Sequence, residues 1–317
     1  MSAFEEDDPR DVRLGQSWTP LQRAKNDALW VLASLLLAGA RGVPRSTLLA
    51  LGRALGRTAF VLSGRHRRMA LANIALALPE LDGVARHALA CRSFQSLGEV
   101  VGDIVSMLPP RAGGAPLVVT EEARAVLDEA IGERRGVVFA SAHLGPWERV
   151  AASLVAAGIP LVTLARESYD PRFSRVYEQL RAALGVRVVW RGAPGAASRI
   201  LRTLRSGGVL GAPMDLRSRR VATCPAPFLG HEAPTAVGPA RMALRMGAAV
   251  VVGTAAPGDD LPLVVTATRI ASNDLPRDEA GASELTSRVN AELSRRILAI
   301  PHAWPWMHPR WPPRTGV

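Results

Sequence analysis

Short apolar runs and helical periodicities alternate along the chain after residue 135. Apolar runs near 136–142, 160–165, 186–190, 209–214, 248–254 and 262–268 predict buried strands. Between and after them, the spacing of apolar and polar positions predicts helices near 146–157, 173–184, 196–206, 237–246 and 283–299. Glycines follow two of these helices, at the position where glycine often ends a helix. This alternation predicts an α/β fold, with a mixed, mostly parallel central sheet flanked by helices.

The first third of the chain has a helical pattern with a different composition. Residues 28–40 (ALWVLASLLLAGA) are free of charge but are short for a membrane span, which takes about 20 apolar residues. Residues 48–62 place leucines near one face and arginines elsewhere, and the basic run GRHRR follows at 64–68. This pattern is typical of a membrane-associated helical segment at the bilayer surface. Ordinary core helices of an α/β protein would give a similar pattern.

The length of 317 residues and the even distribution of apolar residues favour a single domain. No long polar or low-complexity segment divides the chain. We therefore expect an acidic N-terminal tail over residues 1–24, the membrane-associated segment over 25–68, the α/β domain over 69–312, and a short C-terminal tail over 313–317.

The formal net charge is +11, and residues 1–12 hold five acids and one arginine, so the rest of the chain is more basic still. Lys25 is the single lysine, and arginine supplies the other cations. Arginine binds phosphates and carboxylates with a planar fork, although a GC-rich genome would produce the same excess without a functional cause. A nucleic-acid partner is not expected, because the chain has no helix-turn-helix, zinc-finger or aromatic RNP signature. A membrane surface or an acidic carrier protein fits the charge better.

Two cysteines, Cys91 and Cys224, stand far apart without a CxxC pattern. This usage argues against a disulfide framework and a zinc site, and no metal or cofactor is expected. The acidic run EEDD precedes the first apolar segment, which is a poor match to a cleaved signal peptide. A reduced environment facing the cytoplasm fits these features.

Polar residues stand where three of the predicted strands end. His143 follows VVFASA, Arg166 follows PLVTLA, and Asp215 follows VLGAPM. Ligands and catalytic groups of open α/β sheets gather at the carboxyl ends of the strands, so one edge could hold all three. Taken one at a time, Arg166 and Asp215 could equally be solvated loop residues.

The segment AHLGPWE joins a strand end to the first turn of the next helix. His143 and Glu148 are five residues apart, and a bend between strand and helix can bring them together. A histidine with an ordinary pKa of about 6.5 is mostly neutral at pH 7 and can act as a general base. A nearby carboxylate would fix its tautomer, so we expect Glu148 to orient His143.

The HxxxxE spacing resembles the signature of the late acyltransferase family of lipid A biosynthesis, a lauroyl/myristoyl-transferase group within the lysophospholipid acyltransferase superfamily. Four further segments resemble that family in the same order: RRMALANIALALPEL (67–81), LRSGGVLGAPMDLRSRR (204–220), PAPFLGHEAPTAVGPARMALRMGAAVV (225–251) and IPHAWPWMHPRW (300–311). The resemblance covers roughly residues 25–312. The chain departs from the family at Pro146, where asparagine is common, and at Leu216, where glutamine is common.

The resemblance implies a membrane-associated acyltransferase of lipid A and lipopolysaccharide biosynthesis. It would move a fatty acyl chain from acyl carrier protein or acyl-CoA to a hydroxyl of a glycolipid, at the inner (cytoplasmic) membrane with its catalytic domain facing the cytoplasm. His143 and Glu148 would be catalytic, without an acyl-enzyme. The expected substrate-binding residues are Arg166, Asp215, Arg217, Arg219 and Arg220.

Two other classes of function stay open. A membrane-associated binding protein could keep the acyltransferase fold without its chemistry. A metal-dependent hydrolase could use His143, Glu148 and Asp215 as ligands, although the chain has six histidines and no HxH or HExxH pair. The residues WPWMHPRW near the C-terminus suit a membrane interface, and they could equally pack the last helix onto the core.

Overall fold

The computed structural model describes residues 17–109, 115–218, 221–259 and 262–312. Its helices are α1 (Pro20–Ala40), α2 (Arg45–Leu62), α3 (Gly64–Ala77), α4 (Gly83–Met107), α5 (Glu121–Gly132), α6 (Trp147–Ala156), α7 (Pro171–Ala183), α8 (Ala196–Arg205), α9 (Gly238–Met246), α10 (Glu279–Ala299) and the short 3₁₀ helix η2 (Pro301–Ala303). Its strands are β1 (Val118–Val119), β2 (Val137–Ser141), β3 (Leu161–Ala165), β4 (Arg187–Trp190), β5 (Val209–Pro213), β6 (Thr223–Phe228), β7 (His231–Ala236), β8 (Ala249–Ala256) and β9 (Val264–Ile270).

The central sheet has seven strands in the order β1-β9-β8-β2-β5-β3-β4. All neighbouring pairs are parallel except β8 and β9, so the predicted mixed, mostly parallel sheet is confirmed. The antiparallel hairpin of β6 and β7 stands apart as a second, two-stranded sheet. The apolar pattern did not predict this hairpin, because prolines at 225, 227 and 234 interrupt it.

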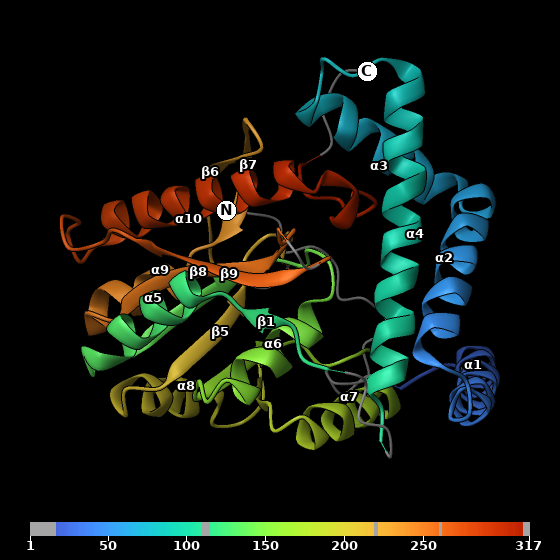
Figure 1. The fold of residues 1–317 in the computed structure, drawn as a ribbon, viewed down its shortest axis with the longest axis horizontal. Coiled ribbons are helices and arrows are strands. Elements are labelled where there is room, and N and C mark those ends of the chain that lie inside the picture. Colours follow the sequence, from blue (N-terminus) through green and yellow to red (C-terminus); the bar gives the residue numbers. More distant parts are fainter. Residues whose placement is uncertain (1–16, 110–114, 219–220, 260–261, 313–317) are drawn as a thin grey trace.

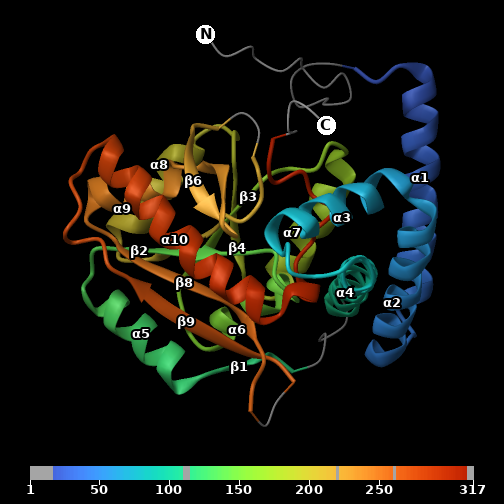
Figure 2. The same ribbon diagram turned by 90° about the horizontal axis from the view of Figure 1, so that it is seen from above.

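Both faces of the central sheet are buried (Figure 1 and Figure 2). On β2, Val138 and Ala140 belong to the apolar cluster that includes α9 and α10, whereas Val137 and Phe139 belong to the cluster that includes α5 and α6. Alternate residues of a strand point to opposite faces, so a strand buried on both faces is apolar throughout. On such a sheet, the polar side chains that bind ligands or react are therefore expected at the ends of the strands.

Helices α2 and α4 lie side by side at one end of the molecule, in contact through glycine (Figure 1). Gly52 of α2 and Gly98 of α4 face each other, and Gly56 and Gly102 lie against the backbone of the opposite helix in the same way. A Cβ at any of the four would overlap backbone atoms of the opposite helix. These glycines therefore let the two backbones approach more closely than any side chain would permit. The contact holds the N-terminal helices against α4, which also contacts η2 next to the site described below.

We expect Gly98→Ala to lower the free energy of unfolding by about 1–3 kcal/mol or more, because the added methyl group must push two helices apart. Gly83→Ala in the same helix is the matched control, because its Cβ would meet open space, and its effect should stay within about 0.5 kcal/mol. Urea unfolding followed by circular dichroism measures both. Equal stabilities of the two variants would contradict the close-packing account.

Helix α1 packs loosely on the rest of the protein. None of its residues is buried, and Leu29, Val31, Leu32, Leu35 and Leu36 are more than half exposed. No helix within the described ranges is both long and apolar enough to cross a membrane. The helix begins at Pro20, inside the range expected for the acidic tail, and the expected boundary between residues 68 and 69 falls within α3.

Candidate active site

The carboxyl end of the central sheet brings His143 and Asp215 together. β2 and β5 are parallel neighbours, with Ser141 opposite Pro213, and each residue of interest follows its strand by two positions. His143 Nδ1 lies 3.0 Å from Asp215 Oδ1, and the His143 backbone N–H donates to Asp215 Oδ2 at 2.9 Å. The shared edge of the sheet thus makes an imidazole–carboxylate pair out of two separate motifs.

The surroundings of this pair favour a charged carboxylate beside a more basic imidazole. Asp215 is completely buried, whereas 29% of the His143 side chain is exposed. Burial alone would raise the pKa of Asp215, but the charge and hydrogen bonds of His143 and the hydrogen bond from Trp304 hold it below its ordinary value. Burial lowers the pKa of His143, but the nearby Asp215 carboxylate outweighs it and raises that pKa above its ordinary value.

Glu148 does not occupy the position beside the imidazole that the sequence predicts for it. It lies in the first turn of α6, and its two carboxylate oxygens accept hydrogen bonds from Arg181 of α7 at 2.7 and 3.1 Å. We expected Glu148 to orient His143, but in the structure Asp215 contacts Nδ1 and Glu148 is directed to α7. Glu148 still acts on His143 through its charge, which raises the histidine pKa. Its catalytic role stays a prediction.

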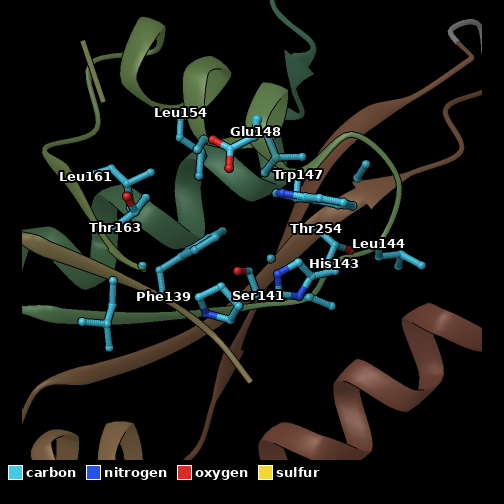
Figure 3. Close-up of a pocket in the computed structure, with 18 of the residues that line it drawn as sticks. Phe139, Ser141, His143, Leu144, Trp147, Glu148, Leu154, Leu161, Thr163 and Thr254 are labelled. Carbon is cyan, nitrogen blue, oxygen red and sulfur yellow. The ribbon is translucent and has the colours of Figure 1, made fainter. Parts of the chain in front are cut away.

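A small cavity of about 60 Å³ is lined by His143, Glu148 and Arg181. Figure 3 shows His143 and Glu148 on its walls. Its walls are mainly apolar and include Phe139, Leu154 and Leu161, which belong to the apolar cluster on the α6 face of the sheet. The Trp147 ring meets the His143 ring edge-on, with the ring centroids 5.0 Å apart. The cavity gives a reacting group a route to the imidazole with few competing polar contacts.

Arg181 is a site residue that the sequence analysis missed. It lines the cavity, its side chain is 12% exposed, and its charge lowers the pKa of His143. Its Nη1 atom is buried and has no hydrogen-bond partner in the described part of the chain. A buried guanidinium N–H without a partner is costly unless a ligand or water meets it, so this atom is a candidate donor to a bound group. No motif pointed to it, because it is one of many arginines on helical segments.

Helix α6 is fixed to the N-terminal helices through the residue after Glu148. Arg149 donates to both carboxylate oxygens of Asp103 on α4, at 2.7 and 2.8 Å, and both side chains are 4% exposed. Arg45 of α2 adds a second guanidinium to the same carboxylate at 2.7 Å. A bidentate, buried ion pair of this kind is geometrically restrictive. It sets the direction of α6 and thereby of Glu148.

The predicted arginines lie at different distances from the pair. Arg166 follows β3, is exposed, and stacks over Tyr169 with its guanidinium 4.6 Å from the ring centroid. It does not line the cavity and lies directly after the carboxyl end of β3. Arg217 is half-buried two residues after Asp215. Arg219 and Arg220 lie outside the described residues.

The C-terminal tryptophans pack into the core, which decides between the two alternatives for WPWMHPRW. Trp304 and Trp306 are completely buried, and Trp311 is 8% exposed. Trp304 also donates its indole N–H to Asp215 Oδ2 at 2.9 Å. The C-terminal segment therefore contacts the imidazole–carboxylate pair through the hydrogen bond from Trp304 to Asp215.

Potential metal ligands do not cluster in the residues that the structure describes: no three His, Cys, Asp or Glu side chains lie together as a metal ion would need. Cys91 and Cys224 are both free thiols, each half-buried.

Comparison with known protein families identifies an acyltransferase family. The model of the bacterial lipid A biosynthesis acyltransferase family matches residues 20–312, which is nearly the whole described chain. Comparison with curated proteins gives no match. The family match includes both halves of the site, the loop after β2 with His143 and the loop after β5 with Asp215.

Proposed function

Because the chain belongs to the bacterial lipid A biosynthesis acyltransferase family, we propose that it moves a fatty acyl chain from an acyl thioester to a hydroxyl of a lipid A precursor or a similar glycolipid. Membership of the family implies an acyltransferase that acts on a lipid A-like acceptor. The observation that carries the mechanism is the pairing of His143 with Asp215 beside an apolar cavity. With Nδ1 engaged by Asp215, Nε2 is the ring nitrogen left to take a proton.

In this mechanism His143 acts as the general base. As the acceptor hydroxyl oxygen attacks the thioester carbonyl carbon, Nε2 takes the hydroxyl proton and a tetrahedral intermediate forms. The carbon–sulfur bond then breaks, the acyl ester is complete, and the departing thiolate receives the proton from the imidazolium. Asp215 stabilises the imidazolium in between and holds the tautomer, as a buried carboxylate does in other histidine-based sites.

We assign the stabilisation of the developing oxyanion to Arg181. Arg181 lines the cavity, its buried Nη1 atom has no partner among the described residues, and Glu148 fixes the rest of the guanidinium by a bidentate ion pair. Preorganised donors aimed at developing charge contribute strongly to catalysis in sites that exclude water. In this assignment Glu148 positions Arg181 rather than His143, which gives the HxxxxE glutamate a function different from the expected one.

The cavity fits the reacting groups rather than a whole substrate. Its volume of about 60 Å³ is well below the several hundred Å³ typical of sites for complete ligands. We propose that the thioester carbonyl enters it while the rest of the donor stays outside. Acyl carrier protein and acyl-CoA both carry the acyl group on a phosphopantetheine thiol, and the exposed Arg166 is our candidate for contacts with the anionic part of either donor.

The test of this function is a transfer assay. Purified protein is incubated in detergent with radiolabelled acyl carrier protein or acyl-CoA and with a lipid A precursor, and in a parallel sample with a total lipid extract. We expect label to move into a lipid whose mass has increased by one acyl group. Absence of any labelled lipid with both donors and native membrane lipids would favour a binding protein without catalysis.

The protein acts on a lipid, and we propose that α1 and α2 dock it on the cytoplasmic face of the inner membrane. Five leucines and Val31 of α1 are more than half exposed, as are Leu51, Leu55, Val61 and Leu62 of α2. Arg53 and Arg57 are exposed on α2. Apolar side chains mixed with cations are the surface that binds an anionic bilayer without crossing it.

We expect the double variant Leu32→Glu/Leu36→Glu to bind vesicles of mixed zwitterionic and anionic phospholipids about tenfold or more weakly than the wild type, because it places two charges on the apolar face of α1. Vesicle co-sedimentation measures this. Leu298→Glu, which changes an exposed leucine of α10, is the control and should bind normally. Equal binding of all three proteins would remove α1 from the docking surface.

A further inference from the structure

One tryptophan of the C-terminal segment contacts Asp215, the carboxylate that pairs with the proposed base His143. Trp304 is completely buried, and its indole N–H donates to Asp215 Oδ2 at 2.9 Å. On the basis of the proposed acyl transfer, we infer that Trp304 is a positioning residue that acts through Asp215: its indole N–H limits the negative potential that this carboxylate places on the imidazole. A hydrogen bond to an ionised, buried acceptor is among the strong ones in proteins.

The indole is itself held from several sides. The Ser93 hydroxyl of α4 donates to the backbone oxygen of Trp304 at 2.6 Å, and the preceding residue, Ala303 of η2, accepts from the backbone N–H of Gly145 at 3.1 Å. Asn73 of α3 donates to the backbone oxygen of Trp306 at 2.8 Å. The segment is thus fastened to two helices and to the loop that carries His143. Such a support fixes the direction of the indole N–H independently of substrate.

The carboxylate has a complete set of donors around it. Its Oδ1 faces His143 Nδ1, and its Oδ2 accepts from the His143 backbone and from Trp304. Removal of the indole N–H leaves both contacts with His143 in place, so Asp215 keeps its direction but loses a positive dipole. The electrostatic potential at the imidazole then becomes more negative, and His143 binds its proton more tightly.

The other charged and titratable groups near the pair are few and can be kept constant. Arg181 and Glu148 act on His143 from α7 and α6. His308, Arg310 and Arg217 act together with Asp215 from the C-terminal segment and the loop after β5. Burial lowers the pKa of His308 to about 4 and that of Arg310 to about 10, so both groups keep their charge state near neutral pH.

The test compares Trp304→Phe with Trp306→Phe. Trp306 is equally buried and donates its indole N–H to the backbone oxygen of Pro301 at 2.7 Å, so its replacement removes a similar hydrogen bond without touching Asp215. We expect the acid limb of the kcat/KM profile to move upward by about 0.5 pH unit in Trp304→Phe and to stay in place in Trp306→Phe. An unmoved or lowered limb in Trp304→Phe, or the same shift in both variants, would overturn the assignment.

A second measurement does not depend on catalysis. The Nδ1–H proton of His143 can be titrated by NMR in the protein without substrates, and the same upward shift is expected for Trp304→Phe. If Trp304→Phe does not fold, β-(3-benzothienyl)alanine at position 304 keeps the ring shape and removes the N–H. If the protein transfers no acyl group but shows this shift, the proposed function is refuted and the role of Trp304 in setting the histidine pKa is kept. If the protein is active and the shift is absent, the role of Trp304 is refuted and the proposed function is kept.

Discussion

His143→Ala is expected to reduce kcat for acyl transfer by about 100- to 10,000-fold, the contribution typical of a positioned general base. The loss should be in kcat rather than in KM, because the imidazole acts on the hydroxyl proton in the transition state and makes no other contact that the mechanism requires. The transfer assay with a saturating donor and a lipid A precursor measures it.

The fold should survive this replacement, because His143 is 29% exposed and lies at a strand end. His302→Ala changes an exposed histidine of the C-terminal segment that is outside the cavity, and it should keep full activity. Normal turnover by His143→Ala would refute the base assignment. Loss of activity in both variants would point to damage of the C-terminal segment instead.

Asp215→Asn is expected to lower kcat by about 100- to 10,000-fold, through a mechanism distinct from that of His143→Ala. The amide keeps the shape of the buried side chain but cannot stabilise an imidazolium, and it can present an N–H to Nδ1 and reverse the tautomer. In the wild type the carboxylate raises the histidine pKa, so the acid limb of kcat/KM should lie above pH 6.5. In Asp215→Asn the remaining activity should show that limb at a lower pH, because the favourable charge is gone.

Comparison of Glu148→Gln with Asp215→Asn separates the roles of the two acids, because Glu148 contacts Arg181 and Asp215 contacts His143. The amide in Glu148→Gln would still reach Arg181, but the guanidinium would lose its counter-charge in a buried place. We expect kcat to fall while the acid limb moves less than in Asp215→Asn. If Glu148→Gln lowers the limb and Asp215→Asn does not, Glu148 is the carboxylate that supports the base.

The sequence was sufficient to place His143 and Asp215 at the ends of strands. Apolar runs predicted β2 and β5 closely, and the rule that ligands gather at the carboxyl ends of parallel strands predicted that His143 and Asp215 would share an edge. The order of strands could not be read from the pattern. Because β5 enters the sheet between β2 and β3, Asp215 rather than a nearer residue in the sequence meets the imidazole.

The contact of Glu148 could not be predicted for a different reason. A spacing of five residues across a strand-to-helix bend says how far apart two side chains are along the chain, but not which neighbouring element each will face. That choice depends on the packing of α6 against α7, where Arg181 offers a guanidinium, and on the buried ion pair of Arg149 with Asp103 that fixes α6. Trp304 is a similar case, because it lies 89 residues from Asp215 in the sequence.

The most direct test of the account is a single-turnover experiment with purified wild-type protein and His143→Ala. Each protein is first mixed with the acyl thioester alone, its intact mass is recorded, and the lipid acceptor is then added. The account predicts no acyl group on either protein, one acylated lipid per thioester consumed by the wild type, and almost none with His143→Ala. A covalently acylated protein that disappears when the acceptor is added, or equal product from both proteins, would contradict direct transfer with His143 as the base.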